Sequence, residues 1–294
     1  MKKILLTGSS GFIGKNILES YLAQKYEIVA PKRTELNLAE ENSVKEFFKN
    51  KEFYALIHSA AKPGHRNADC TKNACEINME IFENLAKYKN KYGKFINLGS
   101  GAIYDLSKNI TDSEEKDILK APPKDEFSLL KFNMYKKIIE LEGFIDLNIF
   151  GIFGRYEDYS IRFISNAICK TLFDLPITLK QDRNFSYLFI EDLMPILEFF
   201  IENTTEYKSY NIVPDEKIRL LEIAEYIKIL SGKNIDIIIK KDAMGLDYTG
   251  SNKRLKQEYK EVKFTDIKNS AERLYNWYKD NKNSLDVNLL LTDK

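Results

Sequence analysis

The chain has 294 residues, 44% of them hydrophobic, which is enough to bury a substantial core and excludes a disordered chain. Its 45 lysines and arginines balance 44 aspartates and glutamates, so the net charge of +1 gives no electrostatic basis for binding nucleic acid or an acidic membrane surface. No apolar run approaches the length of a membrane span.

Cysteine and histidine are too scarce to indicate a metal centre. Cys70, Cys75 and Cys169 form an odd set in a chain without a secretory leader, and the two histidines add few further ligands. We therefore expect free thiols, a cytoplasmic location and no metal site.

The first distinctive stretch is an apolar run over residues 3–7 that breaks into glycines spaced three apart and then resumes with helical spacing. This pattern predicts a strand, a tight turn and a helix whose amino end could bind a diphosphate. The alternative is an ordinary strand-to-helix turn, but the position directly after an apolar strand favours a nucleotide site. The residues expected to face the dinucleotide are Gly8, Ser10, Gly11, Phe12, Ile13 and Gly14.

A basic turn follows the second expected strand, residues 26–30. Lys32 and Arg33 stand where a dinucleotide site that takes NAD usually carries a carboxylate, and the turn itself offers none. Cations there suit the additional phosphate of NADP, so NADP is the expected cofactor and NAD the alternative. The competing interpretation is a solvated basic turn in a lysine-rich protein.

Alternating strands and helices continue to about residue 150. After a helix over 40–50, a strand over 53–58 ends in His58, which we interpret as a buried structural histidine, and leads to the small residues Ala60 and Ala61 and then Lys62. A long helix over 69–92 precedes a strand over 94–98, whose carboxyl end carries Ser100. Carboxyl ends of parallel strands are where such sheets bind ligands.

The rest of the chain predicts one further strand of this sheet and a second region. Residues 106–123 are polar and are expected to form an irregular cover, before a helix over 128–142 and a strand over 145–150. The alternation predicts an α/β fold with a doubly wound parallel sheet. We expect a dinucleotide-binding domain over 1–150, to which 184–213 returns, and a smaller mixed α/β substrate-binding region over 151–294.

In this order the motifs resemble the extended short-chain dehydrogenase/reductase family, whose Rossmann-type members epimerise, dehydrate or reduce nucleotide-activated sugars. The resemblance covers almost the whole chain and rests on residues 7–14, 59–61, 99–104 and 183–187. Within the family, residues 33–38 and 60–62 are most similar to 4-keto-6-deoxy-sugar reductases of the GDP-fucose synthase type, which use NADPH. The resemblance also implies a homodimer.

The resemblance implies a role for four positions. Ser100 matches the serine that holds the reacting sugar oxygen, and Lys131 matches the lysine that holds the nicotinamide ribose. Arg183 matches a residue that binds the nucleotide diphosphate of the sugar. Phe127 stands where the family has the tyrosine that exchanges a proton with the sugar oxygen, and Ala102 replaces the cysteine that fucose-synthase-like enzymes use for epimerisation.

Phe127 leaves three explanations open. The protein binds ligands without catalysis, another group or water donates the proton, or the phenylalanine was introduced deliberately. We expect an NAD(P)-dependent oxidoreductase that reduces a keto sugar attached to a nucleotide. The alternatives are epimerisation or dehydration of such a sugar, and a catalytically silent nucleotide-sugar-binding protein.

Overall fold

Six strands form the central sheet of the protein, whose computed structural model describes residues 1–62 and 73–291. In chain order the strands are β1 (Lys3–Thr7), β2 (Glu27–Val29), β3 (Ala55–His58), β4 (Phe95–Leu98), β6 (Phe144–Ile149) and β11 (Ser209–Ile212). Their order across the sheet is β11-β6-β4-β3-β1-β2, and every neighbouring pair is parallel. The predicted α/β fold is therefore confirmed.

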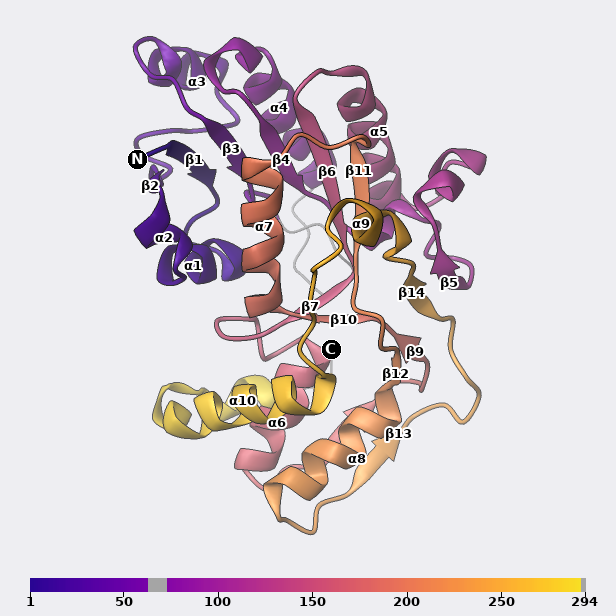
Figure 1. Cartoon of the computed structure of the whole chain (residues 1–294). Coiled ribbons are helices and arrows are strands. Elements are labelled where there is room, and N and C mark those ends of the chain that lie inside the picture. The colour runs from indigo at the N-terminus through magenta and orange to yellow at the C-terminus, as the bar shows by residue number, and fades with distance from the viewer. Residues whose placement is uncertain (63–72, 292–294) are drawn as a thin grey trace.

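Helices cover both faces of the sheet (Figure 1). One face carries α1 (Phe12–Glu19), α2 (Leu22–Lys25) and α7 (Leu193–Glu202), and the other carries α3 (Glu41–Phe48), α4 (Ala74–Ala86) and α5 (Glu126–Glu140). Side chains of β1 alternate between the two layers, because successive residues of a strand point to opposite faces. Ile4 and Leu6 pack in the first layer and Leu5 in the second, so β1 is buried on both sides.

Three further helices gather at the end of the molecule opposite α3 (Figure 1), namely α6 (Phe163–Leu172), α8 (Leu220–Ser231) and α10 (Ile267–Asp280). The short α9 (Lys253–Glu258) lies beside β11 instead. The chain also forms three small sheets, made of β5 (Ile110–Ser113) with β14 (Tyr248–Gly250), β9 (Asn184–Phe185) and β12 (Ile218–Arg219), of β7 (Gly151–Phe153) with β10 (Tyr187–Phe189), and of β8 (Ile177–Leu179) with β13 (Ile237–Ile239). Short 3-10 turns are η1 (Lys89–Lys91), η2 (Gly101–Ile103), η3 (Glu115–Lys120), η4 (Ile190–Asp192), η5 (Lys282–Ser284) and η6 (Val287–Leu290).

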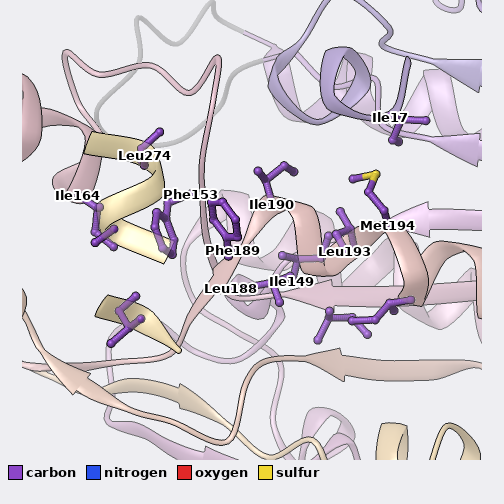
Figure 2. Packing of buried hydrophobic residues seen from close by; sticks show 14 of the residues in the cluster. Ile17, Ile149, Phe153, Ile164, Leu188, Phe189, Ile190, Leu193, Met194 and Leu274 are labelled. Atoms are coloured by element: carbon purple, nitrogen blue, oxygen red, sulfur yellow. The ribbon is translucent and has the colours of Figure 1, made fainter. Parts of the chain in front are cut away.

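One hydrophobic cluster joins the sheet layer to these helices. It runs from Ile17 of α1 through Met194 of α7 to Phe153 of β7 and on to Ile164 of α6 and Leu274 of α10 (Figure 2). All five side chains are almost completely buried. The second region therefore packs directly against the first. No helix among the described residues is both long and apolar enough to cross a membrane.

Two helix boundaries differ from the sequence prediction because of local hydrogen bonds. The first helix, expected to run to about residue 24, breaks at Ser20, whose hydroxyl donates to the Ile17 carbonyl and accepts from the Leu22 N–H. The helix expected from residue 128 begins at Glu126, because the Asp125 carboxylate caps it by accepting from the Ser128 N–H at 2.9 Å. Phe127 therefore lies inside the first turn of α5.

The expected irregular cover over residues 106–123 is partly regular. Strand β5 pairs with β14, more than a hundred residues further along the chain, and η3 follows it. A non-local partner of this kind leaves no periodic signal in the segment itself, which explains the wrong prediction. The long helix expected over 69–92 is represented by α4 and η1, and its expected start, with Cys70, lies outside the described residues.

A buried carboxyl group between β7 and α6 gives the fold a pH-dependent stability. Glu157 is only 6% exposed, and the Ser165 hydroxyl donates to its Oε2 at 2.6 Å. Burial raises the pKa of Glu157 from 4.5 to about 8. The folded chain therefore holds a proton there that the unfolded chain releases, so this group favours folding at low pH and loses that contribution as the pH rises toward 8.

Glu157→Gln is expected to raise the unfolding free energy at pH 8 and above, by at most about 4–5 kcal/mol, since each pKa unit corresponds to about 1.4 kcal/mol. The neutral amide needs no desolvation of charge and can still accept the Ser165 hydrogen bond. Chemical denaturation at several pH values measures this. The gain should vanish at pH 4 and below, where the carboxyl is protonated in both states, and Glu225→Gln on the exposed face of α8 serves as the control. An equal effect at both pH values would contradict the assignment.

Candidate active site

The glycines after β1 form a cradle in which backbone replaces side chains. A Cβ added to Gly8, whose φ is +73°, would lie 2.6 Å from the Ala60 nitrogen, and a Cβ on Gly14 would lie 2.3 Å from the Gly8 carbonyl oxygen. The Gly11 N–H closes the turn by donating to the Gly8 oxygen at 3.1 Å. Only glycines permit α1 to sit this close to the end of β1.

The amino end of α1 is open to solvent next to this cradle. The helix starts at Phe12, its N-cap is Gly11, and its first turn contains no acidic residue. Ser10 and Gly11 are exposed, whereas Phe12 and Ile13 are half-buried. A helix end without a side-chain cap offers N–H donors and a positive dipole end to an anion. The cradle thus fits the diphosphate of a dinucleotide.

The other wall of the cradle is the loop after β3. The Thr7 hydroxyl and His58 Nδ1 are hydrogen-bonded at 2.8 Å, and the Ala60 N–H donates to the Thr7 hydroxyl oxygen at 3.4 Å. The side-chain amide of Asn78 in α4 holds the Lys62 backbone. Its oxygen accepts from the Lys62 N–H at 2.7 Å, and its nitrogen donates to the Lys62 carbonyl at 3.0 Å. The segment that contains Ala60, Ala61 and Lys62 therefore lies beside the glycine turn. This is the switch point of the sheet, since the chain adds β2 on one side of β1 and β3 on the other.

His58 is a structural residue, as interpreted from the sequence. It is buried at the end of β3, and burial together with the charge of Lys131 lowers its pKa to about 3. The imidazole is neutral at neutral pH, so it serves as a hydrogen-bond partner of Thr7.

The basic turn contains a carboxylate that its sequence description left out. Lys32 and Arg33 are both exposed, and Glu35 folds back so that its Oε2 accepts from the Lys32 N–H at 2.7 Å. We expected no carboxylate in this turn, and this contact corrects that expectation. Glu35 lies three positions after Lys32, and the turn folds its side chain back to the Lys32 backbone. The Glu35 carboxylate is engaged with backbone, while the two cationic side chains extend into solvent.

Ser100 and Lys131 lie on elements that pack together. Ser100 is the N-cap of η2, and its Oγ accepts from the Ala102 N–H at 3.1 Å. Lys131 is one helical turn after Phe127 on α5, which packs against η2, and its Nζ lies 5.7 Å from the centre of the Phe127 ring. Phe127 therefore occupies the place beside the ammonium, but it offers no hydroxyl.

A buried carboxyl group that the sequence analysis missed lies close enough to Lys131 for their opposite charges to interact. Asp146 of β6 is 2% exposed, and the Asn97 amide of β4 donates to its Oδ1 at 2.7 Å. Burial raises the pKa of Asp146 to about 6, although Asn97 and the Lys131 charge oppose the shift. Burial lowers the pKa of Lys131, and Asp146 opposes that shift in turn. A carboxylate inside an otherwise apolar strand is the sequence signal that could have revealed this pair.

A row of aromatic rings lies between Arg183 and the Ser100 loop. Its guanidinium lies 5.2 Å from the centre of the Phe185 ring, and the rings of Phe185 and Tyr248 are 5.0 Å apart. The Tyr248 ring is 4.9 Å from that of Phe150, which packs against Gly101 next to Ser100. The structure thus links Arg183 to the Ser100 loop through these rings, whereas Lys32 and Arg33 lie in a separate exposed turn. Tyr248 has no sequence signal of its own, because its place depends on the pairing of β14 with β5.

The parallel sheet, its switch point between β1 and β3, and the glycine cradle define the protein as an α/β dinucleotide-binding protein. The profile of the NAD dependent epimerase/dehydratase family matches residues 4–213. The chain therefore belongs to the NAD dependent epimerase/dehydratase family, which confirms the family-level resemblance predicted from the motifs.

Relatives with assigned names are similar over most of their length. The chain is 23% identical to the GDP-L-colitose synthase of Yersinia pseudotuberculosis, over 96% of this chain and 99% of that protein. It is 25% identical to the GDP-L-fucose synthase of Sinorhizobium fredii, over 81% and 82%. Its fold is similar to MlghC, a GDP-mannoheptose C4 reductase from Campylobacter jejuni with NADP bound, with a TM-score of 0.79, 18% identity and coverage of 95% and 98%.

Proposed function

We propose that this protein is an NADP-dependent oxidoreductase that reduces the keto group of a nucleotide-activated sugar. The observation that supports the proposal is that the glycine cradle follows β1 and Ser100 follows β4, at the carboxyl ends of strands in one parallel sheet, while Lys131 lies on α5, which packs against η2 next to Ser100. The names of the relatives, two GDP-sugar synthases and a GDP-sugar reductase, support the same substrate class.

Each residue of the site would have its own role in such a reduction. A bound nicotinamide dinucleotide would supply the hydride. Lys131 would hold the ribose hydroxyls next to the nicotinamide, the Ser100 hydroxyl would hold the sugar oxygen on which negative charge develops, and Arg183 would bind the nucleotide diphosphate. A guanidinium suits this last task because its planar donors can grip two phosphate oxygens at once.

Phe127 favours a second candidate, a nucleotide-sugar-binding protein without catalysis, because its ring lies beside Lys131 without a hydroxyl. Epimerisation is less well supported, because Ala102 is 4% exposed and has no group that could remove a proton from carbon. A thermal-shift screen of nucleotide sugars with NADP(H) present tests the substrate class, since a ligand that binds only the folded state raises the melting temperature. No shift with any nucleotide sugar would overturn the proposal.

Arg33→Ala is expected to weaken NADPH binding by roughly ten- to a hundredfold and to leave NADH binding nearly unchanged, because a charge-assisted hydrogen bond contributes about 1.5–3 kcal/mol. Fluorescence titration with both cofactors measures this. Lys45→Ala, on the exposed face of α3, is the control for a lost surface charge. Equal NADPH affinity of the Arg33 variant and the parent would show that the basic turn is only solvated.

We also propose a homodimer in the cytoplasm. A groove between α4 and α5, lined by apolar Phe82, Ala86 and Leu141 and by charged side chains, supports pairing through these two helices. Buried Cys169 is a free thiol, which suits a reducing compartment. Light scattering of the purified protein tests the oligomeric state.

A further inference from the structure

We propose that Asp182 is a positioning residue for Arg183 and thereby sets the affinity of the site for the nucleotide diphosphate of the sugar. This inference rests on the proposed function, in which Arg183 binds that diphosphate. It starts from the hydrogen bonds that fix both residues to the amino end of α8, where β9 lies beside β12 (Figure 1).

The Asp182 carboxylate is buried and held by one arginine. The residue is only 4% exposed, and its Oδ2 accepts from Arg219 Nε at 2.9 Å and from Nη2 of the same guanidinium. A guanidinium that donates through two nitrogens fixes the orientation of its partner as well as balancing its charge. Rotation of the Asp182 side chain would therefore break both hydrogen bonds at once.

The same carboxylate binds the amino end of α8. Asp182 Oδ1 accepts from the Leu221 N–H at 3.0 Å, and the Arg183 carbonyl accepts from the Leu220 N–H at 3.1 Å. Leu220 and Leu221 are the first two residues of α8, where N–H groups have no partner within the helix. The positive end of the helix dipole also favours a carboxylate here. The helix thus holds the backbone of residues 182 and 183 in one position.

A second carboxylate fixes the residue on the other side of Arg183. Asp247 Oδ1 accepts from the Asn184 N–H at 3.3 Å and from the Asn184 side-chain amide at 3.0 Å. The Gly245 N–H donates to the Asp182 carbonyl at 2.7 Å. Segments far apart in sequence therefore meet around Arg183, and both of its neighbours in the chain are tied to them.

The Arg183 side chain packs over the Phe185 ring from this fixed backbone. Its guanidinium lies 5.2 Å from the centre of that ring, and Phe185 itself pairs with Ile218 of β12. A guanidinium grips two phosphate oxygens only when its plane is correctly oriented. Movement of the backbone at residue 183 would turn this plane, so Asp182 controls diphosphate affinity through Arg183.

Asp182→Asn is expected to weaken binding of a nucleoside diphosphate about tenfold, which is within the cost of misplacing a positioning group. An amide has a single oxygen, so it cannot accept from Arg219 and Leu221 together. The probe is whichever of GDP, UDP and dTDP the unaltered protein binds most tightly, measured by isothermal titration calorimetry. The dissociation constant of NADPH should stay within about twofold, because the glycine cradle is a separate part of the fold.

Kinetics should separate binding from turnover. For a 4-keto-6-deoxy sugar that carries the same nucleotide, KM should rise by the same factor while kcat stays within about twofold, because the substitution acts on binding alone. Asp215→Asn is the matched control. Its carboxylate also accepts from a basic side chain, Lys256 at 2.6 Å, and from the Asn252 amide at 3.0 Å, but these partners belong to the start of α9. This variant should change neither constant.

A double variant shows whether Asp182 acts through Arg183. Arg183→Met removes the guanidinium, so adding Asp182→Asn should weaken binding of the nucleoside diphosphate no further than Arg183→Met alone. A purely structural role would make the two losses additive, and additive losses would overturn the inference. Unchanged affinity in Asp182→Asn, or an equal loss of NADPH binding, would overturn it as well.

If Asp182→Asn does not fold, Arg219→Lys provides the same test, because lysine keeps the charge but loses the paired donors. We expect about threefold weaker binding of the nucleoside diphosphate, and unchanged affinity overturns the inference. Arg183→Met with the affinity of the unaltered protein removes Arg183 from the site and this inference with it. An unaltered protein that binds none of the three nucleoside diphosphates overturns the proposed function itself.

Discussion

Lys131→Met is expected to lower kcat/KM for a nucleotide keto sugar by about a thousandfold. In the proposed site the ammonium donates to two ribose hydroxyls, and two charge-assisted hydrogen bonds of about 1.5–3 kcal/mol each correspond to that scale. Methionine keeps the length and packing of the side chain. Steady-state kinetics and NADPH titration together show whether cofactor binding or turnover is lost.

The matched control is Lys136→Met, which removes an exposed lysine from the same helix. Removing Lys131 also leaves Asp146 without its counter-charge, which is expected to raise the pKa of that carboxyl further and to lower stability near neutral pH. The double variant Lys131→Met with Asp146→Asn should recover stability without activity. If Lys131→Met alone retains full kcat/KM, the residue has no part in the reaction.

Gly14→Ala is expected to weaken NADPH binding at least about a hundredfold and to lower the unfolding free energy by about 1–3 kcal/mol, the usual cost of overpacking. The added Cβ would lie 2.3 Å from the Gly8 oxygen and 2.6 Å from the Ser9 Cα, and both are backbone atoms that cannot rotate away. Helix α1 would have to move off the cradle, and its N–H groups would move with it.

The sign of the stability change distinguishes a tight contact at Gly14 from an open helix position. In an open helix, glycine to alanine stabilises by up to about 1 kcal/mol, so a gain in stability would show that the contact is not tight. Gly11→Ala is the graded control, because its Cβ meets a single atom at 3.3 Å and should cost less. Denaturation and fluorescence titration of both variants decide the question. A Gly14→Ala protein that is stable and binds NADPH normally would contradict the cradle.

The sequence allowed the sheet to be predicted because its signals are local. Apolar strands such as β1 and β3 are short runs bounded by polar residues, and the spaced glycines mark the turn that follows β1. Errors arose where a single side chain controls a boundary. Ser20 interrupts the first helix and Asp125 starts α5 early, each through one hydrogen bond to backbone.

The site was only partly predictable because its chemistry depends on segments far apart in sequence. Ser100 and Lys131 lie in recognisable motifs, and the structure places them on packed elements. Asp146 comes close to Lys131 only after β6 pairs with β4, and no periodic pattern reports such pairing. This buried carboxyl group was therefore the part of the site that the sequence revealed least.

The most direct test of the proposed function is oxidation of NADPH by the purified protein with a panel of GDP- and dTDP-4-keto-6-deoxy sugars, followed by absorbance of the reduced nicotinamide. We predict that one sugar is reduced with one NADPH consumed per alcohol formed, and that NADH supports a slower reaction. Binding of a nucleotide sugar without any loss of NADPH, or formation of an epimer without net oxidation, would contradict it.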